Sequence, residues 1–391
     1  MTSKNSPDRS SAGPRLSRRG LIGAAAGLGV VGVGGMGTAA WASAAASSAG
    51  PGASSRPDLV GLPDTVFAAL KRHRLVAIGE VHGLQEHFDA LVSVLTDPRL
   101  PDLVDDVVVE GGNSLYQPVA DRFVSGLPVA NSELRPLWRN STNSPLATGD
   151  EPVYENLYRV ARAVNWRLPA QRRIRILLGD APIDWPNTTT PDQVLALRNE
   201  RDAFAASLIQ REVLDKGRRA LISYGAGHVL HHADTPATPP PGVVSLIEQQ
   251  TGQRVFSLVT LVALAGDPGG LAARLSAYPR GVVIPTAGTW LGTFDAGDVF
   301  TAIAPGPSGQ PVNVDCGVSL GALTDGGLYL GRAEELTMSR PDPAIYLDSA
   351  YWAELQRRNA LQGGVVDLGA LRQEQSVHFT PQSVPPGLLC S

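Results

Sequence analysis

Four acidic and imidazole side chains stand at points where apolar runs give way to glycine. Glu80 and His82 are separated by one valine and flanked by glycines, after an apolar run over 75–78. Glu110 follows three consecutive valines, and His228 follows a Gly-Ala-Gly segment. Carboxylates and imidazoles can transfer protons, orient one another or bind a divalent metal such as zinc or manganese. The four residues are therefore candidates for both catalysis and metal binding.

The sequence positions of these residues predict that they meet. Apolar, partly β-branched runs ended by glycine are typical of buried strands. In open α/β folds, ligands bind at the carboxyl ends of such strands. Residues two apart on a strand face the same side, so Glu80 and His82 share a pocket if the strand continues through Gly79. His87, early in the next predicted helix, is a candidate cofactor ligand.

Each candidate also has a structural interpretation. Glu80 could accept hydrogen bonds at a helix N-terminus, and His82 or His228 could be a hydrogen-bonded turn residue. Glu110 could form a buried salt bridge with an arginine, because an unpaired buried carboxylate is costly. His87 could be a core or a solvated helix residue. Both interpretations stay open at each position.

Arg201 and Asp202 lie in a charged segment of a long predicted helix. Charge runs on helices usually face solvent, so these two residues are additional candidates for the pocket rather than leading ones. The chain contains no G-x-S-x-G, H-E-x-x-H, C-x-x-C or Walker motif. The sequence therefore gives no support for those standard sites.

The fold class follows from alternating strands and helices. Such alternation predicts an α/β fold with a mainly parallel sheet flanked by helices and a site at the C-terminal ends of the strands. Thr190 is a predicted N-cap followed by proline, and Gly217 is the predicted end of the same helix. The predicted strands are 75–79, 106–110, 174–179, 220–223, 254–262 and 327–330, and the predicted helices are 86–95, 114–124, 154–166, 191–216, 243–250 and 349–360.

The first 45 residues, 1–45, predict a twin-arginine signal peptide. Arg18 and Arg19 precede an uncharged stretch over 20–41 and small residues that fit a cleavage site. We expect export across a bacterial cytoplasmic membrane by the twin-arginine machinery, to the periplasm, the cell envelope or the medium. We expect no integral membrane segment after removal of the signal, and an N-terminal anchor if the signal is retained.

Beyond the signal, residues 46–57 are rich in serine, alanine, glycine and proline and predict a flexible linker. Residues 58–391 predict one large domain with proline-rich loops at 232–242 and 304–311. The formal net charge is −4, which argues against nucleic acid or anionic lipid as a partner. Cys316 and Cys390 could pair in an oxidising compartment, but two cysteines do not define a disulfide scaffold.

Together these segments resemble the superfamily of erythromycin esterase-like and ChaN-like (haem-uptake, TIKI-type) proteins. The resemblance covers about residues 74–228 and is closest to the ChaN-like branch, where the Glu and His are also separated by one residue. Erythromycin esterases usually carry one more residue there, which argues against macrolide hydrolysis. The matching segments are Gly79–Gly83 with His87, Val108–Glu110, Arg201-Asp202 and Gly225–His228.

The resemblance implies an α/β fold with the Glu and His residues gathered at one end of the sheet. Members include esterases, metal-dependent proteases and haem-binding proteins, so the activity stays open. Our first hypothesis is an exported hydrolase of an ester or amide bond in a small molecule or peptide. Glu80 or His82 would take a proton from water with help from Glu110, and His228 would stabilise or protonate the reacting oxygen, with or without a divalent metal.

Two other function classes remain as alternatives. The first is a haem- or metal-ligand-binding protein of the cell envelope, with His82, His87 or His228 as an axial ligand. The second is an interaction module of the envelope with little catalysis.

Overall fold

The computed structural model describes residues 59–146, 149–233, 241–305, 310–373 and 376–390. The predicted signal peptide (1–45) and linker (46–57) lie outside the described residues. The same holds for residues 234–240 and 306–309, which belong to the two predicted proline-rich loops. The extent of the single domain over 58–391 stays a prediction.

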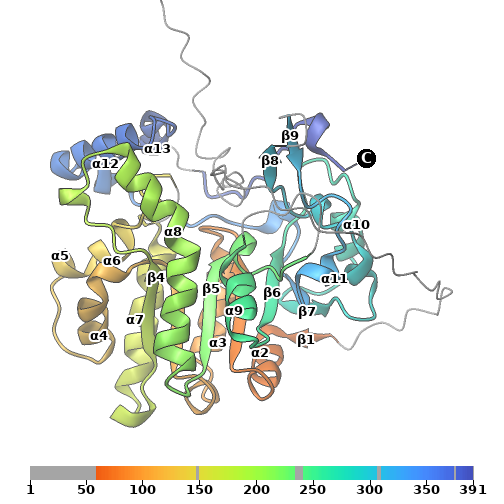
Figure 1. Ribbon diagram of the computed structural model, residues 1–391, viewed down its shortest axis with the longest axis horizontal. Coiled ribbons are helices and arrows are strands. Elements are labelled where there is room, and N and C mark those ends of the chain that lie inside the picture. Colours follow the sequence, from red (N-terminus) through yellow and green to blue (C-terminus); the bar gives the residue numbers. More distant parts are fainter. Residues whose placement is uncertain (1–58, 147–148, 234–240, 306–309, 374–375, 391) are drawn as a thin grey trace, which may run out of the picture.

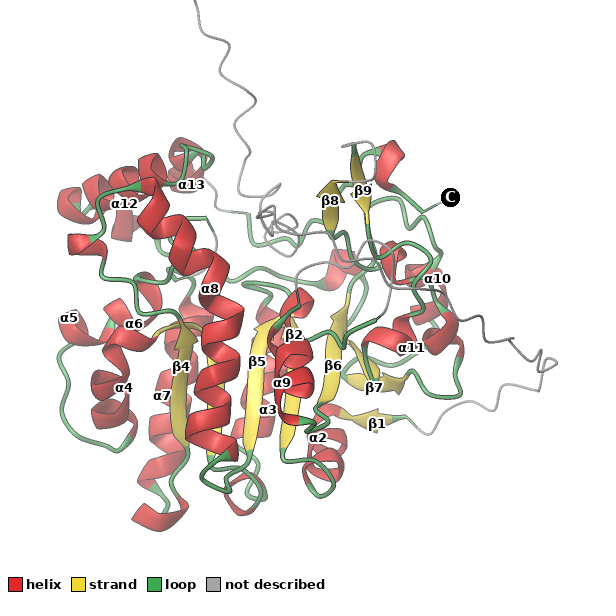
Figure 2. Cartoon of the chain, viewed as in Figure 1, coloured by secondary structure: helices red, strands yellow, loops and turns green. Residues whose placement is uncertain are grey.

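An eight-stranded sheet forms the centre of the fold and confirms the predicted α/β class (Figures 1 and 2). Six neighbouring strands run parallel, and β7 is antiparallel to both of its neighbours. In spatial order the strands are β1 (Val60–Gly61), β7 (Val282–Pro285), β10 (Gly326–Tyr329), β6 (Phe256–Leu261), β2 (Leu75–Glu80), β5 (Ala220–Gly225), β3 (Asp106–Asn113) and β4 (Arg175–Asp180).

The central strands are apolar because both faces of the sheet are covered. Every residue of β2, β3 and β5 is buried, as expected of a parallel sheet between two helical layers. Helices α2 (Leu62–Leu70), α3 (Gln85–Leu95), α4 (Gln117–Val124) and α7 (Pro152–Trp166) pack into one hydrophobic core, and α8 (Pro191–Ile209), α9 (Val243–Thr251), α10 (Leu271–Leu275) and α11 (Leu320–Leu323) pack into the other.

Helix α8 begins as the sequence predicts. Thr190 Oγ1 accepts a hydrogen bond from Gln193 N, and Gln193 Oε1 accepts one from Thr190 N. The predicted helix to residue 216 is wrong in its last part, because α8 ends at Ile209 and a π-helical turn follows over Gln210–Leu214. Gly217 then adopts a positive φ of 70°, as its predicted role as a stop requires.

The predicted helix over 114–124 also differs from the structure. Its first residues form a 3-10 turn, η2 (Ser114–Tyr116), in which the Asn113 side chain accepts a hydrogen bond from Leu115 N. Helix α4 starts only at Gln117, beside the proline at its N-terminus. The short helices α5 (Asn131–Leu134) and α6 (Pro136–Arg139) follow it.

A C-terminal cap, residues 343–373, lies above the carboxyl end of β4 in Figure 1. It contains η10 (Pro343–Leu347), α12 (Ser349–Leu361) and α13 (Leu368–Gln373) around a small apolar cluster that also includes Leu146. Buried Arg358 ties the cap to the body by donating to the Arg139 carbonyl at 2.9 Å and to Asn140 Oδ1 at 2.8 Å. The cap therefore borders the end of the sheet where the sequence predicts the site.

The remaining segment between β7 and β10 carries a two-stranded sheet of β8 (Ile303–Pro305) and β9 (Pro311–Asn313). Cys316 and Cys390 form a disulfide that fastens the C-terminal segment to this region. Sulfur atoms pack so closely over Gly297 that a Cβ there would lie 2.3 Å from Cys390 Sγ. Within the described ranges, no helix combines the length and apolar character needed to cross a bilayer.

Candidate active site

The predicted site residues come from three adjacent strands in the order β2, β5, β3. Glu80 is the last residue of β2 and pairs in register with Gly225, the last residue of β5. Glu110 lies within β3 rather than at its end, at the start of a bulge where the pairing with β4 shifts between Val109 and Asn113. Bulges re-aim side chains. The three strand ends thus bring Glu80, Glu110 and the turn after β5 together.

Glu80 and His82 form a tight pair. His82 Nδ1 donates to Glu80 Oε1 at 2.6 Å, and both side chains are buried. Burial acts to lower the pKa of His82, but the Glu110 and Glu80 carboxylates outweigh it and raise that pKa to about 9. Burial raises the pKa of Glu80, in spite of the hydrogen bond from His82. His82 is therefore charged at neutral pH and presents its Nε2–H to the site.

Glu110 has one satisfied oxygen and one that has no hydrogen-bond partner among the described residues. Oε2 accepts from Gly225 N at 2.7 Å, whereas buried Oε1 accepts no hydrogen bond. Three nitrogen atoms surround Oε1 just beyond hydrogen-bond distance: His228 Nε2 at 3.7 Å, His82 Nε2 at 3.9 Å and Arg201 Nη1 at 3.9 Å. Burial would raise the pKa of Glu110, but the positive charges around it, His82 and Arg201 among them, lower it to about 2.

His228 belongs to a second carboxylate–imidazole pair. Its Nδ1 donates to Asp202 Oδ1 at 2.6 Å, and its Nε2 accepts from Arg201 Nη2 at 2.9 Å. These two bonds define an imidazole that carries its proton on Nδ1 and a lone pair on Nε2. Arg201 and Asp202, which sequence reasoning gave only as additional candidates, thus belong to the site.

Glycine is required where β5 passes between the two carboxylates. A Cβ at Gly225 would lie 3.0 Å from His82 Cε1 and Nε2 and 3.3 Å from Glu110 Oε2. A Cβ at Gly79 would lie 2.8 Å from the Ala226 Cα atom. The contact at Gly79 is too short for any Cβ, and those at Gly225 would push its neighbours apart by a few tenths of an ångström, so these glycines let the imidazole and the turn pack directly on backbone.

Three of the four predicted metal ligands form a group that could hold a cation. One ligand atom each from Glu80, His82 and Glu110 lies within 4.8 Å of the others, and all three residues are buried. His228 is not part of this group, and its Nε2 accepts from Arg201. The site therefore offers two carboxylates and one imidazole to a metal, a set that suits zinc or manganese.

His87, the candidate cofactor ligand, lies apart from the cluster in the core. His87 is only 1% exposed, and its Nδ1 is hydrogen-bonded to Thr260 Oγ1 at 2.8 Å. Its buried Nε2 has no hydrogen-bond partner among the described residues. Burial, with the nearby charge of His82, lowers the pKa of His87 to about 3. In the structure His87 is thus a core residue of helix α3.

Sequence reasoning missed Asp180, the last residue of β4. The buried carboxylate accepts from Thr142 N at 2.6 Å and from Thr142 Oγ1 at 2.7 Å. Burial raises the pKa of Asp180 to about 7, although both hydrogen bonds and the charge of Arg201 oppose this. The signal was present, because Asp180 follows an apolar run and a glycine as Glu80 does.

Two tyrosines complete the surroundings of the carboxylates. Tyr154 Oη donates to Glu80 Oε1 over a long 3.4 Å. The buried Tyr224 hydroxyl has no hydrogen-bond partner among the described residues and sits where a Cβ at Gly179 would be, only 1.7 Å away. Nothing in the sequence marks either tyrosine, because aromatic residues in such positions are usually core.

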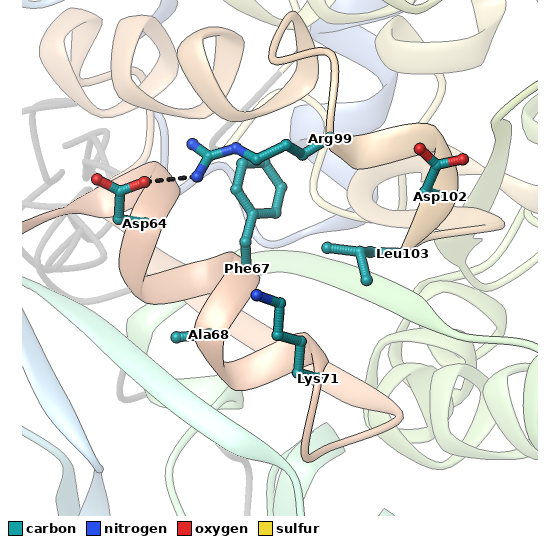
Figure 3. Close-up of a pocket in the computed structure, with 7 residues that line it drawn as sticks. All are labelled: Asp64, Phe67, Ala68, Lys71, Arg99, Asp102 and Leu103. Carbon is teal, nitrogen blue, oxygen red and sulfur yellow. Dashed lines mark hydrogen bonds and ion pairs between the residues drawn. The ribbon is translucent and has the colours of Figure 1, made fainter.

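Two cavities of the described part of the chain differ greatly in size. A cavity of about 10 Å³, the size of one water molecule, is lined by residues that include Glu80, Glu110 and Ser223. A larger one of about 310 Å³ lies between α2 and the segment before β3, at the opposite end of the sheet (Figure 3). Arg99 covers it from above Phe67 and is already bonded to Asp64 at 2.6 Å.

No family model matches this chain, and no curated protein matches it. Among solved structures, one of bacterial protein toxins is 19% identical with a TM-score of 0.33 over 52% of this chain; the chain covers 37% of the length of that protein. A Bacillus cereus protein is 12% identical with a TM-score of 0.46, covering 68% of this chain and 90% of that one.

A structure of ChaN of Campylobacter jejuni with cofacial haem is also similar to this chain. It is 12% identical with a TM-score of 0.32, covering 51% of this chain and 86% of that one. Identities and scores of this size limit the likeness to the general fold. What the site does must therefore be argued from its own geometry.

Proposed function

We propose that the protein is a hydrolase of ester or amide bonds. The observation that carries this proposal is Glu110 Oε1, which has no hydrogen-bond partner among the described residues. It lies near two imidazoles in different protonation states, those of His82 and His228. His82 carries a proton on the nitrogen nearest Glu110, and His228 Nε2, 3.7 Å from Glu110 Oε1, carries a lone pair that accepts from Arg201. One acid and one base on either side of a carboxylate oxygen suit the attack of water on a carbonyl group.

In this proposal His228 is the general base. A water molecule bound to Glu110 Oε1 would give its proton to His228 Nε2, 3.7 Å from that oxygen, after the water replaces Arg201 Nη2 at the single lone pair of Nε2. Asp202 fixes the tautomer by accepting from Nδ1 and stabilises the imidazolium that results. The sequence hypothesis gave proton abstraction to Glu80 or His82, but a His82 pKa of about 9 leaves that imidazole protonated at neutral pH.

His82 is then the acid, and Arg201 stabilises negative charge. His82 Nε2–H would donate to the leaving oxygen or nitrogen, while Glu80 holds the other ring nitrogen. The Arg201 guanidinium, whose side chain is only 16% exposed, would donate to the oxyanion of the tetrahedral intermediate. In a site this dry, such hydrogen bonds are stronger than in water.

A divalent metal fits the same residues. Histidines that bind metals usually donate their second N–H to a carboxylate, and His82 Nδ1 already donates to Glu80. Glu110 and His82 Nε2, with Glu80, would hold the ion, whose chemistry would be to lower the pKa of a bound water. Binding would require His82 Nε2 to lose its proton.

Haem binding, the alternative from the sequence, is kept as an outcome of the test. His87 is buried in the core, and the cavity beside Glu80 and Glu110 has a volume of only about 10 Å³. Ligand pockets for molecules of drug size or larger measure about 300 Å³ or more. The site residues therefore give haem less support than they give hydrolysis.

The test compares the purified protein with Glu110→Gln, His228→Asn and Asp202→Asn variants on a panel of nitrophenyl esters and nitroanilide peptides. We expect a loss of at least about a hundredfold in kcat for each, with unchanged circular dichroism. Glu86→Gln is the matched control, because Glu86 binds Thr337 outside the site. Full activity in all three variants would contradict the proposal.

Two further measurements decide between the metal, haem and metal-free forms. Elemental analysis of the protein as purified reports zinc, manganese or iron. Titration with haemin reports a Soret band if haem binds. A stoichiometric iron porphyrin with no hydrolysis of any ester or amide would replace the hydrolase proposal by the haem alternative.

We also propose export by the twin-arginine route, on the basis of Arg18, Arg19 and the Cys316–Cys390 disulfide, which is compatible with an oxidising compartment. Replacing both arginines by lysine should leave the precursor inside the cell. N-terminal sequencing of the exported form would locate the cleavage site or show that the signal is retained.

A further inference from the structure

Arg198 is a partly buried cation with few hydrogen-bond or ion-pair partners among the described residues. It lies one helical turn before Arg201 on α8, and its one hydrogen bond to a described residue is a long one, from Nη1 to Gln362 Oε1 at 3.4 Å. No carboxylate of the described residues lies within ion-pair distance of its guanidinium. Two arginines of the cap, in contrast, have a counterion: Arg357 and Arg358 both form ion pairs with Glu354.

The acidic groups around Arg198 are engaged elsewhere. Asp202, one turn further along α8, is bonded to His228 at 2.6 Å. Asp180 accepts two hydrogen bonds from Thr142. Residues three apart on a helix share a face, so Arg198 and Arg201 present two neighbouring guanidinium groups to the same region. Like charges so placed repel each other, and an anion between them would relieve the repulsion.

The position of Arg198 places such an anion relative to the reaction. Arg201 contacts His228 and lies next to Glu110, so it marks the reacting centre. Arg198 lies about 4.5 Å closer to the N-terminus of α8 along the helix axis, at a rise of about 1.5 Å per residue. It lies on the cap side, since it bonds to Gln362 at the end of α12, and Gln362 is itself fixed by a 2.6 Å bond to the Ser144 carbonyl.

We infer that the substrate carries an oxyanion group, a carboxylate or a phosphate, which Arg198 binds together with Arg201 on the cap side of the scissile bond. This inference rests on the proposed hydrolase function and names its substrate class. Guanidinium groups suit this task because their planar N–H donors match the paired oxygens of carboxylates and phosphates. Burial and the nearby Arg201 charge lower the pKa of Arg198 to about 10, as expected of a cation that lacks its counterion.

The kinetic test compares two esters of equal chain length, para-nitrophenyl hydrogen glutarate and para-nitrophenyl valerate. We expect the wild type to prefer the anionic ester, and Arg198→Gln to lower the ratio of the two kcat/KM values by about tenfold to a hundredfold. Arg198→Lys should retain part of the ratio. Arg211→Gln is the control, because exposed Arg211 contacts only Glu212 among the described residues.

Calorimetric titration with glutarate and with inorganic phosphate separates this inference from the hydrolase proposal. If no ester is hydrolysed, the hydrolase proposal fails, and weaker binding of either anion to Arg198→Gln than to wild type still supports the anion site. An equal kcat/KM ratio in wild type and Arg198→Gln overturns the inference. So does equal anion binding by the two proteins, or none by the wild type.

Discussion

Replacing Glu110 by glutamine should lower the pKa of His82 and so change which pH values permit catalysis. Glu110 Oε1 lies 3.9 Å from His82 Nε2, and its charge is the strongest of the effects that raise the His82 pKa. Glutamine has the same shape, and its amide oxygen can still accept from Gly225 N. The substitution therefore removes a charge with little change in packing.

The size of the effect follows from Coulomb's law. Two unit charges about 4 Å apart interact by about 4 kcal/mol at an effective dielectric constant of 20 and by about 1 kcal/mol in water. One pKa unit corresponds to about 1.4 kcal/mol, so the His82 pKa should fall by about one to three units. A value of about 9 in the wild type would then move towards or below neutrality.

The assay is an NMR titration of the His82 ring carbon in wild type and Glu110→Gln. In parallel, the alkaline limb of the kcat/KM profile should lie near pH 9 in the wild type, because His82 must be protonated to act as the acid. Glu86→Gln, which removes a carboxylate bonded to Thr337, should leave the His82 titration unchanged. A His82 pKa in Glu110→Gln within 0.3 unit of the wild type (about the precision of such a titration) would refute the electrostatic reasoning.

The same substitution has a defined effect on stability. The folded-state pKa of His82 is raised, so its protonated form contributes stability that is present below pH 6.5 and is lost as the pH rises through about 9. The pKa of Glu110 is lowered, so its contribution is present above pH 4.5 and is lost as the pH falls through about 2. Glu110→Gln should therefore lose roughly 3 kcal/mol of unfolding free energy at pH 7, measured with urea.

Three other substitutions test the packing around the site. Asp180→Asn should stabilise the protein by roughly 2 kcal/mol more at pH 8 than at pH 5. Because the pKa of Asp180 is raised in the folded state, the wild type loses unfolding free energy as the pH rises from about 4 through about 7. Equal urea midpoint shifts at both pH values would contradict this. Gly179→Ala should cost about 1–3 kcal/mol, since its Cβ would overlap the Tyr224 hydroxyl, and an unchanged melting temperature would show that the strands can separate. Cys390→Ser should lose up to about 4 kcal/mol, because the disulfide with Cys316 spans 74 residues; identical urea midpoints for wild type with and without reductant would contradict that value.

The sequence predicts the parts of this fold that have local causes. β2 and β5 begin where predicted, and β2 continues through Gly79 to Glu80, as the shared pocket with His82 requires. The N-cap of α8 is confirmed to the residue, because Thr190 and Gln193 are close in the chain. Local chemistry of this kind needs no knowledge of the tertiary structure.

Features that depend on distant neighbours were not predictable. The bulge in β3 that re-aims Glu110 arises from its pairing with β4. The π-helical turn after Ile209 and the antiparallel β7 carry no distinctive residue pattern. The pairing of Cys316 with Cys390 was one possibility from the sequence, and the structure shows that it forms.

Site membership was predictable for residues at strand ends and less so for residues on helices. Glu80, His82 and His228 have glycine neighbours that marked them, whereas Arg201 and Asp202 resemble any exposed charge pair on a helix. Arg198 has no local signal at all. Its significance comes only from the lack of a described carboxylate within ion-pair distance of its guanidinium, which is a property of the folded chain.

The strand order has a consequence for when the site can exist. β5 lies between β2 and β3, although it follows both of them, and β4, in the chain. A nascent polypeptide that ends before residue 220 has Glu80 and Glu110 but lacks the strand that sets their spacing, the amide that holds Glu110, and His228. The proposed site can therefore form only after β5, the last of these four strands to be synthesised, has inserted between β2 and β3.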